Sequence, residues 1–192
     1  MFRTFRILSN FLVFIPFHNA LEYFREEIKK LMDHIWSPWR MKYIGRQKTP
    51  RGCIFCKAVG REDGVDNLIV MRGKLAFVIL NRYPYTSGHV MVVPYTHAST
   101  MGELDEVSLS EVMYLIRQAI TAINAVYKPE GFNIGANLGA VAGAGITNHI
   151  HFHVVPRWGG DTNFMTSVSG TRVLPEELCD TYQRLKDAWP KS

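Results

Sequence analysis

Three histidines alternate with apolar residues in the segment Asn148–Val155, and no other stretch of the chain carries as much reactive chemistry. The alternation has a period of two residues, which predicts a β-strand. The imidazoles then project from one face of that strand, about 7 Å apart, while the apolar side chains cover the other face. The histidines are His149, His151 and His153, and the apolar residues are Ile150, Phe152 and Val154. Imidazole serves as a nucleophile, a proton carrier or a metal ligand near neutral pH.

Three interpretations of this face stay open. A single histidine on a strand is usually solvated or hydrogen-bonded, but clustered imidazoles disfavour one another's protonation and destabilise a fold that does not use them. The three rings could instead converge on one metal ion and leave a fourth position for water. In the third interpretation one ring attacks phosphorus and the others assist. The strand contains no Asp or Glu that could orient metal-bound histidines, which favours the nucleophile.

A loop of glycine and alanine, residues 139–145, comes directly before the histidines. Small residues let backbone N–H groups approach an anion closely. The loop is not a Walker loop, because no Gly-Lys-Ser/Thr follows, and a strand follows it where a dinucleotide fingerprint would open a helix. A plain turn would explain the loop by itself. Its place ahead of three histidines favours a phosphate-binding role, with Gly143 and Gly145 beside the phosphate.

The chain contains three cysteines, Cys53, Cys56 and Cys179. An odd count with a C-x-x-C spacing is not a disulfide framework and indicates a reducing compartment, so we expect a cytoplasmic protein. Cys53 and Cys56 form half of a zinc site. Because the sequence has no second C-x-x-C, histidines would have to complete the site; the alternative is a pair of buried thiols.

Composition limits the class of ligand. The 192 residues suit one domain with a sizeable core, and 47% hydrophobic with 20% charged residues is ordinary for a globular protein. The 22 Lys and Arg against 17 Asp and Glu give a net charge of +5. No basic run stands out, so the charge favours a small phosphorylated ligand, and we expect neither a nucleic-acid polymer nor a membrane as partner.

The N-terminus superficially resembles a secretory signal, because two arginines precede an apolar run over residues 7–17. Polar residues and a proline interrupt the run, His18 stands where a cleavage site needs a small residue, and the run is too short to span a membrane. We expect residues 1–31 to be an extension or an over-called translation start. If they are translated, Ala20–Ile35 could form an amphipathic helix. Residues 32–192 would then form a single domain.

Hydrophobic patterning in the rest of the chain predicts an α+β fold with a largely antiparallel sheet. A capping box, Ser108-x-x-Glu111, predicts the start of a long helix whose apolar residues continue to Val126. A final helix is expected from Pro175 to near Trp189, and Cys53–Cys56 opens a short turn or helix. The other predicted strands are Leu68–Met71, Lys74–Leu80, His89–Pro94 and Phe132–Ala136.

At this point the residues resemble a known family. His149–Val155 is similar to the His-φ-His-φ-His-φ-φ signature of the histidine triad (HIT) superfamily, where φ is an apolar residue. Leu80–Pro84 and Gly88–Pro94 resemble its nucleotide-binding segment, and with Cys53–Cys56 the resemblance covers most of residues 36–158. It implies a HIT-like α+β fold with a mainly antiparallel sheet, one long helix and a C-terminal helix. It also implies a homodimer paired through the long helix and an edge strand.

The resemblance implies nucleotide chemistry as well. His151 would attack the α-phosphorus of a nucleotide, and the nucleotidyl-histidine would then be discharged to an acceptor. His153 would either hydrogen-bond the phosphate oxygens or protonate the leaving group, and His149 would orient the strand or bind metal. From the residues alone, Asn81 is more readily a turn residue than a ribose contact, and His89 could be a surface histidine. The implied nucleotide-binding residues are Asn81, His89, Asn137, Gly143, Gly145, His153 and Trp158.

The metal ligands implied by the resemblance are Cys53, Cys56, His97 and His149. Four protein ligands would make a closed and therefore structural zinc site. We expect no organic cofactor.

Further features resemble the branch of bacterial diadenosine tetraphosphate phosphorylases, in which inorganic phosphate accepts the adenylyl group. Gly145 stands where many hydrolytic members carry Gln, four residues before the first triad histidine, and the change enlarges the pocket beside the α-phosphate. The segments Trp36–Arg40 and Pro156–Met165 point to the same branch, with Arg157 and Trp158 as candidates for shaping the acceptor site. The alternatives are a HIT-type hydrolase of nucleotide phosphoanhydrides or phosphoramidates, a metal-dependent hydrolase, and a nucleotide-binding protein without turnover.

Overall fold

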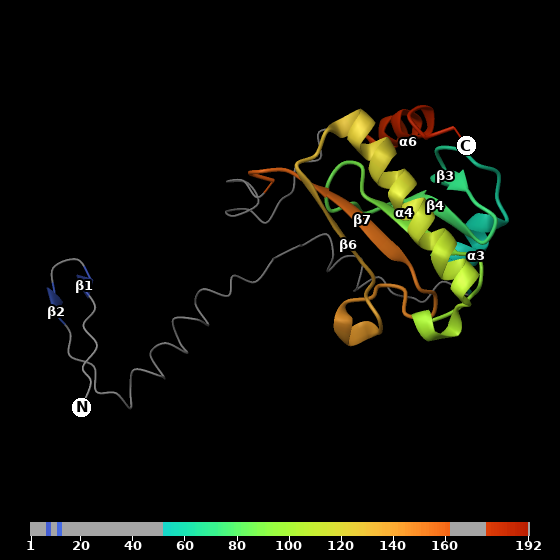
Figure 1. The fold of residues 1–192 in the computed structure, drawn as a ribbon, viewed down its shortest axis with the longest axis horizontal. Coiled ribbons are helices and arrows are strands. Elements are labelled where there is room, and N and C mark those ends of the chain that lie inside the picture. The colour runs from blue at the N-terminus through green and yellow to red at the C-terminus, as the bar shows by residue number, and fades with distance from the viewer. Residues whose placement is uncertain (1–6, 9–10, 13–51, 162–175, 192) are drawn as a thin grey trace. The chain divides into compact units, whose positions relative to one another are not determined.

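The computed structural model describes residues 7–8, 11–12, 52–161 and 176–191 (Figure 1). The chain divides into two units, residues 1–36 and 37–192. In the first unit, β1 (Ile7–Leu8) pairs with β2 (Phe11–Leu12) in an antiparallel register. The predicted helix Ala20–Ile35 lies outside the described residues, and the boundary before residue 32 stays a prediction.

The second unit is built on a five-stranded antiparallel sheet with the strand order β3-β4-β5-β7-β6. All residues of β4 and β5 are buried, because both faces of the central strands are covered. The α+β class and the antiparallel sheet are confirmed, and each predicted strand overlaps an observed one. The strands are β3 (Ile69–Arg72), β4 (Ala76–Leu80), β5 (Val90–Pro94), β6 (Gly131–Gly135) and β7 (Phe152–Arg157).

The long helix α4 (Glu106–Tyr127) packs on β4, β5 and β7 and runs diagonally across the sheet (Figure 1). The predicted capping box at its start is wrong. Asp105 is the N-cap, and its carboxylate accepts the backbone N–H of Ser108 at 2.6 Å. Glu111 lies inside the helix, where its carboxylate accepts the backbone N–H groups of Lys74 (2.7 Å) and Leu75 in the β3–β4 turn. The glutamate therefore attaches the turn to the helix instead of capping the helix.

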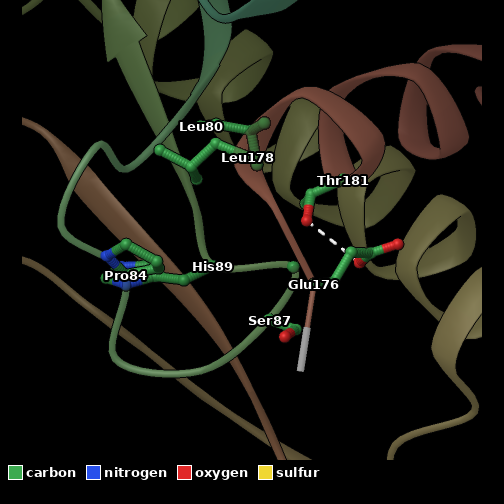
Figure 2. Close-up of a pocket in the computed structure, with 8 residues that line it drawn as sticks. Leu80, Pro84, Ser87, His89, Glu176, Leu178 and Thr181 are labelled. Atoms are coloured by element: carbon green, nitrogen blue, oxygen red, sulfur yellow. Dashed lines mark hydrogen bonds between the residues drawn. The ribbon is translucent and has the colours of Figure 1, made fainter. Parts of the chain in front are cut away.

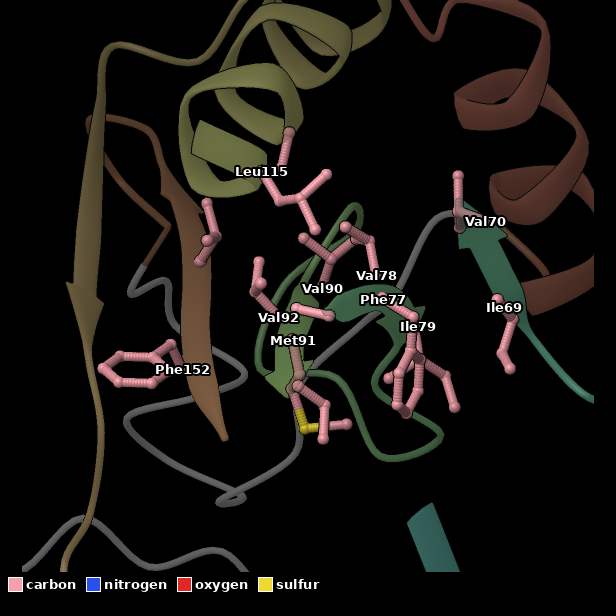
Figure 3. Packing of buried hydrophobic residues seen from close by; sticks show 14 of the residues in the cluster. Ile69, Val70, Phe77, Val78, Ile79, Val90, Met91, Val92, Leu115 and Phe152 are labelled. Carbon is pink, nitrogen blue, oxygen red and sulfur yellow. The ribbon is translucent and has the colours of Figure 1, made fainter. Parts of the chain in front are cut away.

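The core between α4 and the sheet consists of aliphatic side chains. Leu115 points from α4 toward Val78 and Val90 (Figure 3). The register pairs Val78 with Val92, so that successive residues of β4 and β5 alternate between this face and the opposite one. Each buried side chain of this size contributes about 1.5–3 kcal/mol relative to exposure.

Shorter elements complete the unit. The C-terminal helix α6 (Leu178–Asp187) packs against α4 and β3. It confirms the final helix, although Pro175 lies outside the described residues. The others are α3 (Ile54–Val59) and the 3-10 turns η1 (Met101–Glu103) and η2 (Ala140–Ala142). None of the helices in the described ranges is long and apolar enough to span a bilayer.

Candidate active site and metal centre

The histidine segment enters the sheet later than the alternation predicts. β7 begins at Phe152, so His149 and His151 precede the strand and His153 lies within it. The register places His153 between Met91 of β5 and Gly135 of β6. The rings of His151 and His153 have centroids 5.0 Å apart, closer than the strand repeat, because the two rings tilt into an edge contact of 73°.

His151 has a defined tautomer. Its Nδ1 lies 2.9 Å from the backbone carbonyl of His149, and because a carbonyl only accepts, Nδ1 carries the proton. Burial lowers the pKa of His151 below its ordinary value of 6.5, while the bond to His149 opposes the shift. The ring of Phe55 lies 5.1 Å away and contributes to that burial. The result is a neutral imidazole whose Nε2 keeps its lone pair, as nucleophilic attack requires.

His153 is hydrogen-bonded to a second buried histidine. Nε2 of His89 lies 3.0 Å from Nδ1 of His153, and the backbone N–H of Tyr85 donates to Nδ1 of His89 at 3.1 Å. The Tyr85 ring stacks on His89 with centroids 4.8 Å apart. His89, which sequence reasoning placed near the phosphates or on the surface, is fully buried next to His153. Tyr85 was not predicted at all.

His149 turns away from the other two triad histidines and joins the cysteines. Its Nδ1 lies 3.2 Å from Sγ of Cys53 and 3.6 Å from Sγ of Cys56, and Cys56 Sγ lies 3.3 Å from Nδ1 of His97. All four ligand atoms lie within 4.8 Å of one another. Ligand atoms around a tetrahedral zinc ion are separated by about 3.5 Å, so these residues fit the ion that their types favour.

The protonation states of this cluster also suit a metal. His149 donates from Nε2 to the carbonyl of Pro94 at 2.9 Å, which leaves the Nδ1 lone pair directed at the thiols. Burial lowers the pKa of His149, so the ring is neutral as a ligand must be. Burial raises the pKa of the Cys56 thiol, and neighbouring Cys53 raises it further, so a cation is what would stabilise the two thiolates.

The separation of His149 from His151 and His153 argues against the metal-dependent hydrolase that the sequence left open. That hypothesis requires His149, His151 and His153 to converge on one ion. Within the described ranges, the group of side chains that could hold a metal contains His149 but neither of the other two. The geometry therefore favours a metal ion beside His151 and His153 over a metal ion bound by them.

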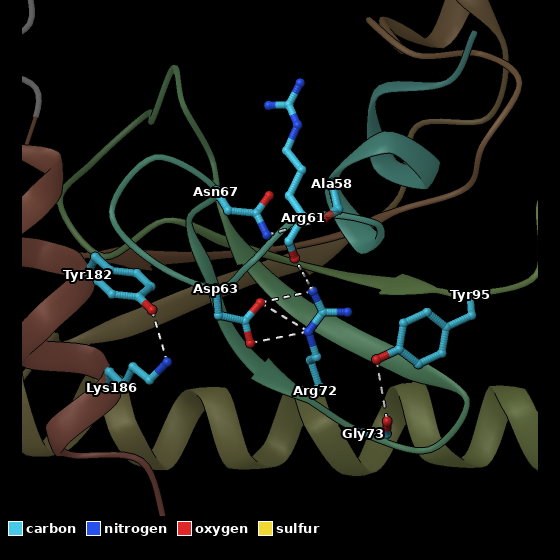
Figure 4. A network of polar contacts seen from close by, with 9 residues as sticks. All are labelled: Ala58, Arg61, Asp63, Asn67, Arg72, Gly73, Tyr95, Tyr182 and Lys186. Atoms are coloured by element: carbon cyan, nitrogen blue, oxygen red, sulfur yellow. Dashed lines mark hydrogen bonds and ion pairs between the residues drawn. The ribbon is translucent and has the colours of Figure 1, made fainter.

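A polar network positions α3, which carries Phe55 and Cys56 (Figure 4). Asn67 donates from its amide to the carbonyl of Ala58 at 3.1 Å and so holds the end of the helix. The Arg72 guanidinium binds the carboxylate of Asp63, with Nη2 to Oδ1 at 2.9 Å. The loop after α3 is thereby joined to β3.

The remaining predicted nucleotide residues lie on loops. The Asn81 side chain accepts the backbone N–H of Tyr83 at 2.9 Å, which is the turn role that competes with the ribose contact. Asn137, Gly143 and Gly145 lie half-buried between β6 and the histidines. Gly143 has a φ of +89°, a conformation that favours glycine.

The segment after β7 contains the two acceptor-site candidates. The guanidinium of Arg157 binds the carboxylate of Asp161 at 2.5 and 3.0 Å and the amide oxygen of Asn133 at 2.6 Å, so it is already engaged by an acid. Trp158 is half-buried directly after the strand. The motif Trp36–Arg40 and residues 162–165 lie outside the described residues.

A small pocket lies between the loop before β5 and helix α6 (Figure 2). Its lining includes His89 but neither His151 nor His153, so it is distinct from the face that carries these two rings. In its wall, Thr181 donates to the carboxylate of Glu176 at 3.0 Å. The lining residues are Leu80, Pro84, Ser87, Gly88, His89, Glu176, Leu178 and Thr181.

Comparison with known proteins agrees with this geometry. The HIT domain family matches residues 63–160. The AP-4-A phosphorylase of Mycobacterium tuberculosis is 38% identical over 167 residues, covering 83% of this chain and 86% of the relative. The adenosine 5'-monophosphoramidase hnt1 of Schizosaccharomyces pombe is 31% identical over 126 residues, covering 66% and 90%. A crystal structure of a Zn-bound histidine triad family protein from Mycobacterium smegmatis superposes with a TM-score of 0.58 at 26% identity, covering 71% and 92%.

Proposed function

We propose that this chain, which belongs to the HIT family, is a phosphorylase or hydrolase of dinucleoside polyphosphates such as diadenosine tetraphosphate. The observation that carries the proposal is the neutral, buried His151, whose Nδ1 is held by the His149 carbonyl so that Nε2 is available for attack. The identity to an AP-4-A phosphorylase and to a monophosphoramidase supports nucleotide phosphorus as the target.

The reaction has two displacements at one phosphorus. Nε2 of His151 attacks the α-phosphorus, forms the N–P bond, and expels the rest of the substrate as a nucleoside polyphosphate. An oxygen of the acceptor then attacks the same phosphorus, breaks the N–P bond and restores the imidazole. With diadenosine tetraphosphate the first product is ATP; the second is ADP if the acceptor is phosphate and AMP if it is water.

We favour inorganic phosphate over water as acceptor. Gly145 has no side chain, so the loop before the histidines leaves room beside the α-phosphate. The 38% identity to an AP-4-A phosphorylase supports the same choice. Asn81, Asn137, Gly143 and Trp158 stay the proposed nucleotide contacts.

A structural zinc ion in the Cys53, Cys56, His97 and His149 cluster belongs to the proposal. When bound, zinc would crosslink α3 to the segment before β7 and supply no acid or nucleophile, because a closed four-ligand site has no open position. The Zn-bound mycobacterial neighbour supports this assignment.

We also propose a homodimer that uses α4 and β6. β6 is an edge strand of the sheet, with Ile134 47% exposed, and Met113 on α4 is 60% exposed. An unpaired edge and exposed apolar side chains favour pairing with a second copy. The cytoplasmic location stays a prediction.

The experiment is product analysis with diadenosine tetraphosphate, with and without inorganic phosphate, together with the intact mass of the protein. A covalent nucleoside monophosphate should accumulate when the acceptor is withheld, and ADP should form when phosphate is present. His151→Ala should lower turnover by at least 10³-fold without abolishing nucleotide binding, whereas His18→Ala in the N-terminal unit is the matched control. AMP release independent of phosphate would exclude the phosphorylase, and a fully active His151→Ala would exclude the nucleophile.

A further inference from the structure

The two cysteines of the metal cluster lie across the first turn of α3. Cys53 is the N-cap of the helix, with an extended backbone (φ −72°, ψ 130°), and Cys56 lies in the first turn. The backbone N–H of Lys57 donates to the carbonyl of Cys53 at 3.1 Å and closes this turn. The two sulfur atoms belong to a set of ligand atoms that all lie within 4.8 Å of one another. Rotation of the two side chains can therefore bring the sulfurs to the bonding distance of about 2.0 Å.

Solvent reaches these thiols unequally. Both cysteines are free, but Cys56 is exposed and Cys53 is half-buried, with its Sγ 3.2 Å from Nδ1 of His149. A small oxidant in solution therefore meets Cys56 first, and Cys53 is the neighbouring thiol that can complete a disulfide. Cys179 is exposed as well, but it is the only cysteine of α6 and has no such neighbour in its helix.

We propose that Cys53 and Cys56 are an oxidation site, at which a hydroperoxide converts the two thiols to a reversible disulfide, empties the proposed metal site and withdraws support from His151. In a reducing compartment a disulfide of this kind is transient, which is how C-x-x-C pairs serve in redox sensing there. The effect on His151 rests on the proposed function, whereas the disulfide and the loss of metal do not.

The reaction balances with hydrogen peroxide as the two-electron oxidant. The sulfur of Cys56 attacks one peroxide oxygen, the O–O bond breaks, and the departing hydroxide takes a proton and becomes water. The sulfur of Cys53 then attacks the sulfenic acid on Cys56, so that the S–S bond forms, the S–O bond breaks and a second water leaves. The two sulfurs together lose the two electrons that the peroxide gains. The protons come from the thiols, or from solvent where the sulfurs start as thiolates.

The disulfide removes half of the proposed metal ligands. The thiolate is the form of cysteine that binds metal, and the sulfurs of a disulfide carry no charge. His97 and His149 would remain, but two neutral imidazoles do not make the closed four-ligand site of a structural zinc ion. Oxidation of the pair should therefore release the metal.

Two contacts carry the change to His151. Phe55 lies between the cysteines in the sequence and is buried, with its ring centroid 5.1 Å from His151 and 5.4 Å from His149. A bond between the residues on either side of Phe55 alters the turn that carries this ring. The second contact is through His149, whose ring lies against Cys53 and whose carbonyl holds Nδ1 of His151 at 2.9 Å. Both the packing and the hydrogen bond of His151 are thus attached to the oxidised turn.

The first measurement maps the bond in the full-length, zinc-loaded wild type and needs no substrate. Trypsin cleaves after Arg51 and Lys57, so the peptide Gly52–Lys57 holds both cysteines and Cys179 lies in another peptide. After hydrogen peroxide, this peptide should lose the mass of two hydrogen atoms, and a colorimetric zinc chelator should detect the released metal. Dithiothreitol should restore the reduced peptide. A peptide that stays reduced, or that gains oxygen as a stable sulfinic acid, would overturn the proposal.

A variant assigns the order of the two steps. In Cys53→Ser the second thiol is missing, so Cys56 should stop at the sulfenic acid and be labelled by dimedone. The matched variant Cys56→Ser should take up much less dimedone at Cys53, because that thiol is half-buried. Equal labelling of the two variants would contradict the assigned order.

The last measurement follows turnover of diadenosine tetraphosphate by reduced, oxidised and re-reduced protein. Oxidation should lower kcat by about 10²-fold, the loss that a displacement of about 1 Å produces in a catalytic group, and dithiothreitol with zinc should restore it. Cys179→Ser is the control and should respond like wild type, because it keeps both thiols of the pair. A protein that contains the disulfide and keeps its full kcat would overturn the link to His151. A reduced protein without turnover would instead reject the proposed function, while the disulfide would still be mapped by mass.

Discussion

Gly88, the residue before His89, offers a test of how tightly the histidine loop is packed. Its φ is +77°, and a Cβ there would lie 3.1 Å from two ring carbons of Tyr127. Left-handed geometry destabilises a non-glycine residue by about 1–2 kcal/mol, and overpacking adds about 1–3 kcal/mol. The smaller unfolded-state entropy of alanine offsets about 0.4–1 kcal/mol. Gly88→Ala should therefore lower the free energy of unfolding by roughly 2–4 kcal/mol.

The Tyr127 ring is held by other contacts and cannot easily move away from an added Cβ, so we expect the loss of unfolding free energy to lie in the upper part of that range. The Tyr127 hydroxyl donates to the carboxylate of Glu176, and the Arg184 guanidinium lies 4.9 Å from the ring centroid. In urea, with an m value of about 2 kcal/mol/M, the midpoint should fall by about 1–2 M. Gly64→Ala is the control, because a Cβ at Gly64 meets nothing within 4 Å.

A double-mutant cycle with Tyr127→Leu separates the two contributions. Removing the ring should recover the steric part of the Gly88→Ala loss and leave the part that comes from backbone strain. If the losses of the two single variants add without interaction, the contact between Gly88 and Tyr127 is not what restricts the loop. A Gly88→Ala protein as stable as Gly64→Ala would refute the reasoning altogether.

Two other perturbations test the site's surroundings. Burial would raise the pKa of Glu176, but hydrogen bonds from Tyr127, Arg184 and Thr181 hold it below the ordinary 4.5. The ionised carboxylate therefore stabilises the folded protein above about pH 4.5, and this stabilisation is lost as the pH falls through the lower folded-state pKa. In urea unfolding, Glu176→Gln should thus be less stable than wild type at neutral pH, and the difference should shrink as the pH is lowered below 4.5. A difference in stability that does not depend on pH would contradict this. For the proposed metal centre, elemental analysis should find zinc in the wild type and in Cys179→Ser but not in Cys56→Ser. Equal zinc content in the two variants would exclude the proposed ligand set.

The sequence predicted the sheet well because its strands are short apolar runs between clear turn signals. β5 differs from its predicted range by one residue, and β4 is only shorter at its start. The beginning of α4 was wrong because two overlapping patterns, Asp105-x-x-Ser108 and Ser108-x-x-Glu111, both resemble N-terminal caps. Which of them forms depends on Glu111 reaching a turn 36 and 37 residues away, and local sequence carries no trace of that contact.

In the site, residue types were predictable and their partners were not. The family signature gave the four cluster residues, and the structure brings them together. The period of two also placed three rings on one face, but the chain becomes a strand only at Phe152, and His149 turns toward the cysteines. Tyr85 could not be found from its side chain, because the bond to His89 comes from a backbone N–H that every residue except proline supplies.

The triad shows how identical side chains acquire different chemistry. His149 donates a hydrogen bond from Nε2 to the carbonyl of Pro94, and its Nδ1 lone pair points at the thiols. His151 donates from Nδ1 to the carbonyl of His149, which leaves a lone pair on Nε2. The backbone N–H of Tyr85 donates to Nδ1 of His89, so Nε2 of His89 donates to Nδ1 of His153. The proton of a neutral His153 ring is then on Nε2. The tautomer of each ring is thus set by whether the chain offers it a backbone acceptor or a backbone donor, which depends on strand register and loop geometry. Because the His149 carbonyl fixes His151 while the His149 ring lies against the cysteines, one residue connects the proposed metal site to the proposed nucleophile.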